Sequence, residues 1–183
     1  RHAAVMILKE LAVNAPSIFY RYVDTFFEVI WPAMNDSKAQ IRESAADALQ
    51  ASLALIHQRE TNRKGSWYAR ILDEVERGLI KGTAESMHGS LLTMNELLRN
   101  TGDFMYPHFE KVCKQVLQYK DHKSSIVRRA VINLLPRLAK FNTSIFIDTY
   151  LTICVSHLLE TLRSSQVSYK IKGDAFLSLG KLS

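Results

Sequence analysis

Lysine and arginine are concentrated in one stretch of this 183-residue chain. Between residues 105 and 143, eight basic side chains face two acidic ones, and the resulting charge of +6 equals the net charge of the whole chain. Clustered cations can bind phosphate, nucleic acid or an acidic protein. Clustered cations also occur on solvated faces, or pair with neighbouring segments of the same protein. The sequence shows no aromatic module for stacking bases, which makes nucleic acid the least favoured of these partners. The candidate partner-binding patch is Lys111, Lys114, Lys120, Lys123, Arg128 and Arg129.

Other residue types that support catalysis or metal binding lack the spacing that those functions need. The chain has no glycine-rich phosphate loop and no kinase catalytic motif. None of its six histidines pairs with a cysteine, an acid or a second histidine at a zinc-site spacing. The acidic cluster Asp73, Glu74 and Glu76 is typical of a solvated helix face. We therefore expect no catalytic, cofactor-binding or metal-binding residue in this segment.

The two cysteines, Cys113 and Cys154, are expected to be free and buried. They are separated by about one repeat of the pattern described below. Equivalent positions on stacked helices lie about 8–10 Å apart, beyond the limit of about 7 Å for a disulfide. The chain has no signal-peptide pattern and starts at Arg1, which indicates an intracellular fragment of a longer chain. No uncharged apolar run approaches the roughly 18 residues of a membrane span, so we expect none.

Small residues recur every 41 to 44 positions. This repeat defines the helices that carry the basic residues and the cysteines. Apolar residues follow four, eight and nine positions later, except at Thr93 and Lys181, which indicates one stripe of an amphipathic helix. Two helices in about 42 residues are typical of HEAT or armadillo repeats. A small side chain lets packed helices approach closely, whereas a larger one would overpack the crossing. The repeat ladder consists of Ala3, Ala45, Gly89, Ala130 and Gly173, with Leu49 and Leu134 as its core leucines.

The predicted fold is all-α: an α–α superhelix, or HEAT-repeat solenoid, of about four and a half helix pairs in one domain over residues 1–183. Ser37 and Gln40 are expected to form a capping box, and Pro136 is expected to kink its helix. The polar link from His57 to Ser66 is expected to be an exposed loop. First helices are expected near residues 17–34, 66–81, 104–119 and 144–163. Second helices are expected near residues 1–13, 37–57, 84–100, 123–141 and 167–182.

Several stretches resemble the amino-terminal HEAT region of the target-of-rapamycin (TOR) kinases, in the same order over nearly the whole chain. The resemblance implies a non-catalytic segment of an ATP-dependent serine/threonine protein kinase, a transferase that controls growth in response to nutrients. No kinase motif is present to carry over, because the catalytic region of that family lies far downstream. The stretches are residues 1–12 (RHAAVMILKELA), 41–45 (IRESA), 48–49, 88–92 (HGSLL), 95–98 (NELL) and 134–139 (LLPRLA), with Trp67 and Tyr68.

The resemblance also implies partners. In that family the amino-terminal solenoid helps to build a dimeric complex, contacts raptor-type or rictor-type subunits, and in part receives a small GTPase. It implies a cytoplasmic location, recruitment through partners to the lysosomal or vacuolar surface, or a nuclear location. Two alternatives stay open: a free-standing HEAT adaptor of the nuclear-transport-receptor or phosphatase-scaffold kind, and a nucleic-acid-binding HEAT protein. The terminal helices lack the polar outer face that a free-standing solenoid needs, which favours the kinase segment.

Overall fold

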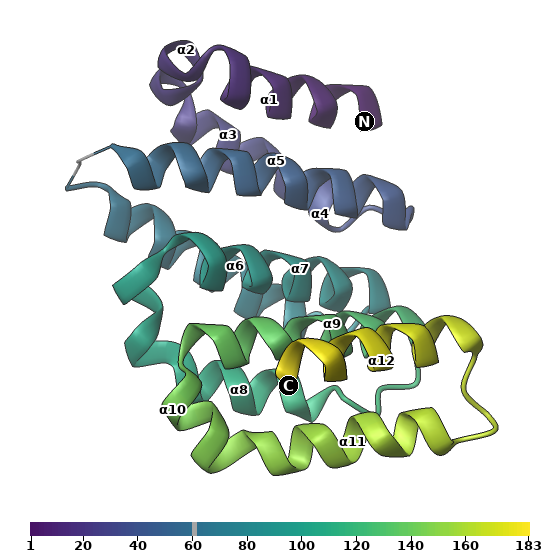
Figure 1. Ribbon diagram of the computed structural model, residues 1–183. Helices are drawn as coiled ribbons and strands as arrows, with labels where there is room; N and C mark the ends of the chain where they lie inside the picture. Colours follow the sequence, from purple (N-terminus) through teal and green to yellow (C-terminus); the bar gives the residue numbers. More distant parts are fainter. Residues whose placement is uncertain (60–61) are drawn as a thin grey trace. The chain divides into compact units, whose positions relative to one another are not determined.

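The computed structural model describes residues 1–59 and 62–183, and these residues form helices and connecting turns without a β-strand. The predicted all-α class is therefore confirmed. The chain divides into two compact units, Arg1–Phe104 and Met105–Ser183, where the sequence suggested one domain. Within each unit, successive helix pairs stack side by side, as in a helical-repeat solenoid (Figure 1).

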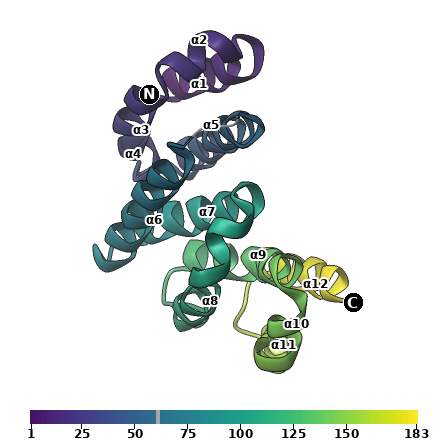
Figure 2. The same ribbon diagram turned by 90° about the vertical axis from the view of Figure 1, so that its left-hand side faces the viewer.

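The first unit has two layers of helices. In the first layer, α5 lies between α1 and α7 (Figures 1 and 2). Helices of the second layer pack against the first: α4 contacts α5 and α7, and α6 contacts α7. The first layer contains α1 (His2–Asn14), α5 (Ala39–Gln58) and α7 (Ala84–Asn100). The second layer contains α2 (Pro16–Arg21), α3 (Val23–Val29), α4 (Trp31–Met34) and α6 (Lys64–Ile80).

The helix expected near residues 17–34 is broken into three short helices. Pro32 lies in the first turn of α4, where its missing N–H costs no hydrogen bond, and this explains the break at Ile30. Nothing in the structure explains the second break, at Tyr22. The link after α5 is shorter than expected, because α6 already begins at Lys64; residues 60 and 61 of that link lie outside the described residues.

In the second unit α9 packs against α8, α11 and α12, and α11 also packs against α12 (Figure 2). The expected helix 104–119 begins as a 3-10 helix, which ends one residue after Pro107. The expected helix 144–163 contains a π-helical turn near its start. The elements are η1 (Gly102–His108), α8 (Phe109–Gln118), α9 (Ser125–Phe141), α10 (Thr143–Ile145), η2 (Phe146–Tyr150), α11 (Leu151–Arg163) and α12 (Tyr169–Leu182).

The long second helices α1, α5, α7, α9 and α12 lie within two residues of the bounds expected from the repeat. Helix α9 continues without a break through Pro136. The capping box expected at Ser37 is wrong: Lys38 is the N-cap residue of α5, and no side chain caps the helix. Instead the Asp36 carboxylate accepts a hydrogen bond from the Lys38 backbone N–H at 3.0 Å, which stabilises the turn just before the helix.

The stretch Thr143–Arg163 is the most apolar long helical segment of the second unit. It has 21 residues, and its most apolar 18-residue window has a mean hydropathy of 1.3, so by length and composition it could cross a membrane. It contains Asp148 and Glu160, so it is not an uncharged apolar run of the kind considered in the sequence analysis. About 33% of its most apolar window is buried inside the unit. Phe146, Tyr150, Cys154 and Leu158 are buried in the helix that packs against α9 and α12. These four side chains belong to the core of the unit, whereas Ile147, Ile153 and Leu159 of the same segment are exposed.

Candidate interaction surfaces

The repeat ladder differs between the inner and the terminal helices. Ala45, Gly89 and Ala130 are buried, whereas Ala3 on α1 and Gly173 on α12 are exposed. Gly89 lies where α7 crosses α4, and a Cβ atom added there would lie 1.9 Å from the Met34 carbonyl oxygen. At this crossing glycine is required by close helix packing, whereas a Cβ on Gly173 would meet open space.

The apolar ladder positions show the same contrast. Leu49 is completely buried and Leu134 is 2% exposed. The residues at the same repeat position in the terminal helices, Ile7 on α1 and Leu177 on α12, are each 60% exposed. Each terminal helix therefore presents an apolar face that the described residues leave uncovered. The other large exposed apolar residues on these helices are Met6, Leu11, Val13, Tyr169 and Phe176.

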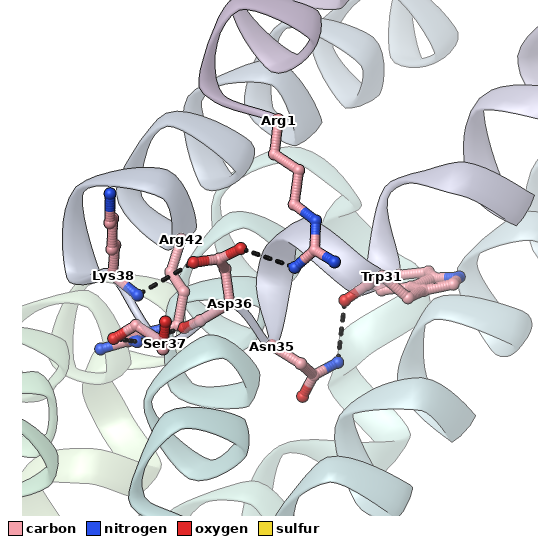
Figure 3. A network of polar contacts seen from close by, with 7 residues as sticks. All are labelled: Arg1, Trp31, Asn35, Asp36, Ser37, Lys38 and Arg42. Atoms are coloured by element: carbon pink, nitrogen blue, oxygen red, sulfur yellow. Dashed lines mark hydrogen bonds and ion pairs between the residues drawn. The ribbon is translucent and has the colours of Figure 1, made fainter.

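A polar network holds the turn between α4 and α5 in place (Figure 3). The Asp36 carboxylate accepts hydrogen bonds from the Lys38 backbone N–H and from Arg1 Nη1, both at 3.0 Å. The bond from the Lys38 backbone is the main reason that the pKa of Asp36 lies below its usual value of 3.8, and Arg1 adds to the effect. Asp36 is thus an ionised, nearly buried anchor between α1 and α5.

Arg42, on α5, completes this network from inside the protein and is only 1% exposed. Its Nη1 donates to the Asp36 and Ser37 carbonyl oxygens at 2.5 and 3.1 Å. Its Nε donates to His88 Nδ1 on α7 at 2.9 Å. A buried charge is tolerated here because each of these bonds replaces water. The arginine therefore ties the turn before α5 to the next helix of the layer.

Sequence reasoning missed Arg42, although a spacing signal for it exists. In the second unit Arg128 Nη1 donates to the carbonyl oxygens of His122 and Lys123 at 2.7 and 2.9 Å. Both arginines therefore bind the carbonyls six and five residues before them. The recurrence of an arginine at the same distance from a polar turn in two repeats would have predicted that it binds the carbonyls of that turn.

The structure separates the six residues of the basic patch into two groups. Lys111 and Lys114, on α8, and Lys123, in the following turn, are exposed. Lys114 Nζ lies 4.0 Å from the Glu110 carboxylate, a surface pair that contributes little to stability.

The other three residues of the basic patch serve contacts within the unit. Lys120 pairs with Asp121, and Arg128 holds the turn carbonyls. Arg129 Nε donates to the Asp174 carboxylate on α12 at 2.5 Å. Three of the six residues thus make hydrogen bonds or ion pairs within the unit, and the two lysines of α8 are exposed. The prediction that the six residues bind a partner stays a prediction.

The cysteines and acidic residues provide no additional chemical site in the described part of the chain. Cys113 and Cys154 are free and buried, as predicted. Burial raises the pKa of each thiol to about 12, so both stay protonated and unreactive at neutral pH. Within residues 1–59 and 62–183, no three His, Cys, Asp or Glu side chains are grouped so that they could hold a metal ion. In the expected acidic face, Glu74 pairs with Arg77 at 2.6 Å.

Stacked helix pairs with buried small crossing residues define a helical-repeat protein. The comparisons with known proteins are more specific. The chain is 42% identical over all 183 residues to "Serine/threonine-protein kinase TOR" from Arabidopsis thaliana, and 42% identical to the protein of the same name from Oryza sativa. It is 36% identical over 182 residues to "Serine/threonine-protein kinase tor1" from Schizosaccharomyces pombe. No family model matches the chain.

These matches cover the whole of this chain but a small part of each relative. The chain spans about 7% of the length of the two plant kinases and 8% of the fission-yeast kinase. The resemblance to TOR kinases predicted from the sequence is therefore confirmed, and the chain corresponds to one segment of such a kinase.

Proposed function

We propose that this chain is a non-catalytic scaffold and protein-interaction segment of a TOR serine/threonine-protein kinase. It supports assembly of the kinase complex that acts in nutrient and growth signalling. The observation that carries the proposal is the match over the full 183 residues to a segment amounting to 7% of plant TOR kinases. The stacked helix pairs support it, because such arrays present extended surfaces for binding other proteins.

In this proposal the surfaces of the chain have separate roles. The buried ladder gives each unit a fixed shape, the open faces of α1 and α12 accept further helices of the same kinase chain, and the exposed lysines of α8 contact an acidic partner. Raptor-type or rictor-type subunits, a small GTPase and a second kinase chain are the proposed partners. The proposed location is cytoplasmic, with recruitment through partners to a lysosomal or vacuolar surface, or nuclear.

The test reverses two charges on one helix face of the full-length kinase. We expect Lys111→Glu with Lys114→Glu to weaken the recovery of a partner subunit in a pull-down, because these side chains are exposed and lie one turn apart. The matched control reverses the exposed Lys140 and Lys170 in the same unit. Unchanged recovery with the α8 variant, or an equal loss with the control, contradicts the proposed role of α8.

Nucleic-acid binding is the weaker alternative, because Lys120, Arg128 and Arg129 already bind groups within their own unit. A salt titration of binding to duplex DNA distinguishes the two functions. Binding that falls steeply as salt rises would favour the nucleic-acid alternative, whereas no binding or a slope near zero supports the scaffold.

A further inference from the structure

A cavity of about 210 Å³ lies within the second unit. Residues of the turn after α8, of α9, of the end of α11, of the link to α12 and of α12 itself line it. Ile132, Val167 and Ile171 form apolar parts of its wall. Asp121, His157 and Glu160 place polar atoms in the same wall. The cavity thus combines an apolar wall with a small number of polar groups, as binding sites for small groups do.

His157 is a buried residue of the wall with one ring nitrogen unsatisfied. It is 7% exposed, and its Nε2 has no hydrogen-bond partner among the residues that the structure describes. Its Nδ1 lies 3.7 Å from the Asp121 carboxylate. Burial lowers the pKa of His157, against the opposing effect of Asp121, so the ring is neutral at physiological pH. The carboxylate favours the proton on Nδ1, which leaves Nε2 as a buried acceptor.

The charged groups around the cavity determine which ligand suits this acceptor. Asp121 and Glu160 are both exposed acids. Lys120 pairs with Asp121 from outside the lining, and Arg128 is held by the two turn carbonyls. The cavity therefore offers a neutral acceptor, the Glu160 carboxylate and an Asp121 carboxylate that already pairs with Lys120, while Nη1 of the lining Arg128 donates to the turn carbonyls. The unmet requirement of His157 Nε2 is a hydrogen-bond donor.

The first unit contains an arginine that binds its turn in the same way as Arg128. There the turn-binding arginine, Arg42, reaches His88 on the next helix. His88 directly precedes ladder residue Gly89, and the residue that precedes Gly173 in the second unit is Lys172. With no histidine at this position, Arg128 stays half-buried and lines the cavity.

We propose that this cavity binds a lysine or arginine side chain. The aliphatic part of the side chain packs against Ile132, Val167 and Ile171, and the cationic group donates a hydrogen bond to His157 Nε2 beside Asp121 and Glu160. This site goes beyond the scaffold role and does not depend on it. The same chemistry could be presented by a basic segment of a protein or by a free alkyl amine, and the experiment separates the two.

The test uses the 183-residue chain with ¹⁵N-labelled histidine and follows the His157 ring nitrogens by NMR. The probes are the peptide acetyl-Ala-Ala-Lys-Ala-Ala-amide, its norleucine counterpart and n-butylamine. Without a probe, we expect Nε2 to be unprotonated. The lysine peptide should shift the Nε2 resonance and bind at least about tenfold more tightly than the norleucine peptide, because norleucine has the aliphatic stem without the donor. Tight binding of butylamine would identify a free amine as the source, and peptide binding alone would identify a protein side chain.

Two variants and a control test the contacts. Glu160→Gln should lower the affinity for the lysine peptide about twofold to fivefold, as expected for the loss of an exposed ion pair. His157→Leu should weaken it about tenfold or more. Glu110→Gln removes an exposed acid outside the cavity and should have no effect. A protonated Nε2 in the free chain, equal binding of the norleucine peptide, or no shift at His157 would each overturn the proposal.

Discussion

Arg42 shows how one residue can determine the geometry of a turn. Its guanidinium stays charged although burial lowers its pKa, because the pKa of arginine starts far above neutral. Two backbone carbonyls and the His88 ring accept its hydrogen bonds. The residue thus fixes the carbonyl groups of the turn before α5.

We expect Arg42→Met to destabilise the first unit by about 3 kcal/mol, because the carbonyls of Asp36 and Ser37 and the His88 ring would lose the hydrogen bonds that Arg42 donates. Chemical denaturation measures the free energy of unfolding. The control is Arg77→Met, which removes an exposed arginine paired with Glu74 and should cost less than about 1 kcal/mol. Equal costs for the two variants would show that Arg42 contributes through its aliphatic stem alone.

Asp24 links α3 to α6 and makes stability depend on pH. Its carboxylate accepts hydrogen bonds from the Trp67 indole at 2.7 Å and from Arg63 at 2.6 Å. The indole bond, followed by that from Arg63, holds the pKa of Asp24 below 3.8. The contribution of ionised Asp24 to the free energy of unfolding is therefore present above pH 3.8. It is lost as the pH falls from there through the lower pKa of the folded state. Asp24→Asn should flatten this acid limb of the unfolding free energy; an unchanged limb would assign the pH dependence to other carboxylates.

Helix crossings in this chain differ in how closely the backbones approach. We expect Gly89→Ala to destabilise the first unit by about 1–3 kcal/mol or more, because the new Cβ would overlap the Met34 carbonyl oxygen. The ladder equivalent, Gly173→Ala, meets open space within a helix and should stabilise by about 0.5–1 kcal/mol. Thermal unfolding of both variants compares the two positions. A loss of stability in Gly173→Ala would indicate that α12 packs against something at that glycine.

The core leucines allow a second comparison between equivalent helices. Leu134→Ala should cost about 2–5 kcal/mol, since it leaves a cavity in the core of the second unit. Leu177→Ala truncates the equivalent residue on α12, which is 60% exposed, and should cost less than about 1 kcal/mol. The free energy of unfolding in denaturant measures both. Similar losses would mean that the exposed face of α12 is covered in solution.

The chain as a whole has two compact units, and each helix contacts its neighbours within a unit. We expect Leu134→Ala to speed amide hydrogen exchange in α9, α11 and α12 while α1 and α5 keep the exchange rates of the unmodified chain, because stability in repeat arrays is largely local. Mass spectrometry of peptic fragments measures this exchange. A uniform increase over all helices would instead show one cooperative unit.

The local pattern of the sequence was sufficient for the helical class, for the positions of the long second helices and for the resemblance to TOR kinases. Those features depend on helical periodicity and on a repeat of about 42 residues, both of which are visible within one segment. Proline positions were also visible: Pro136 lies inside α9, as expected, whereas Pro32 begins a new helix where one continuous helix was expected.

Folding in three dimensions determined which charges remain available and where a cavity forms. Arg129 and Asp174 are 45 residues apart, and Arg42 and His88 are 46 apart, so no local pattern could pair them. The cavity beside His157 likewise needs a turn, three helices and a link to meet. The physical reason is that a side chain satisfies its hydrogen bonds with whatever atoms packing brings near, and packing depends on residues far away in the chain.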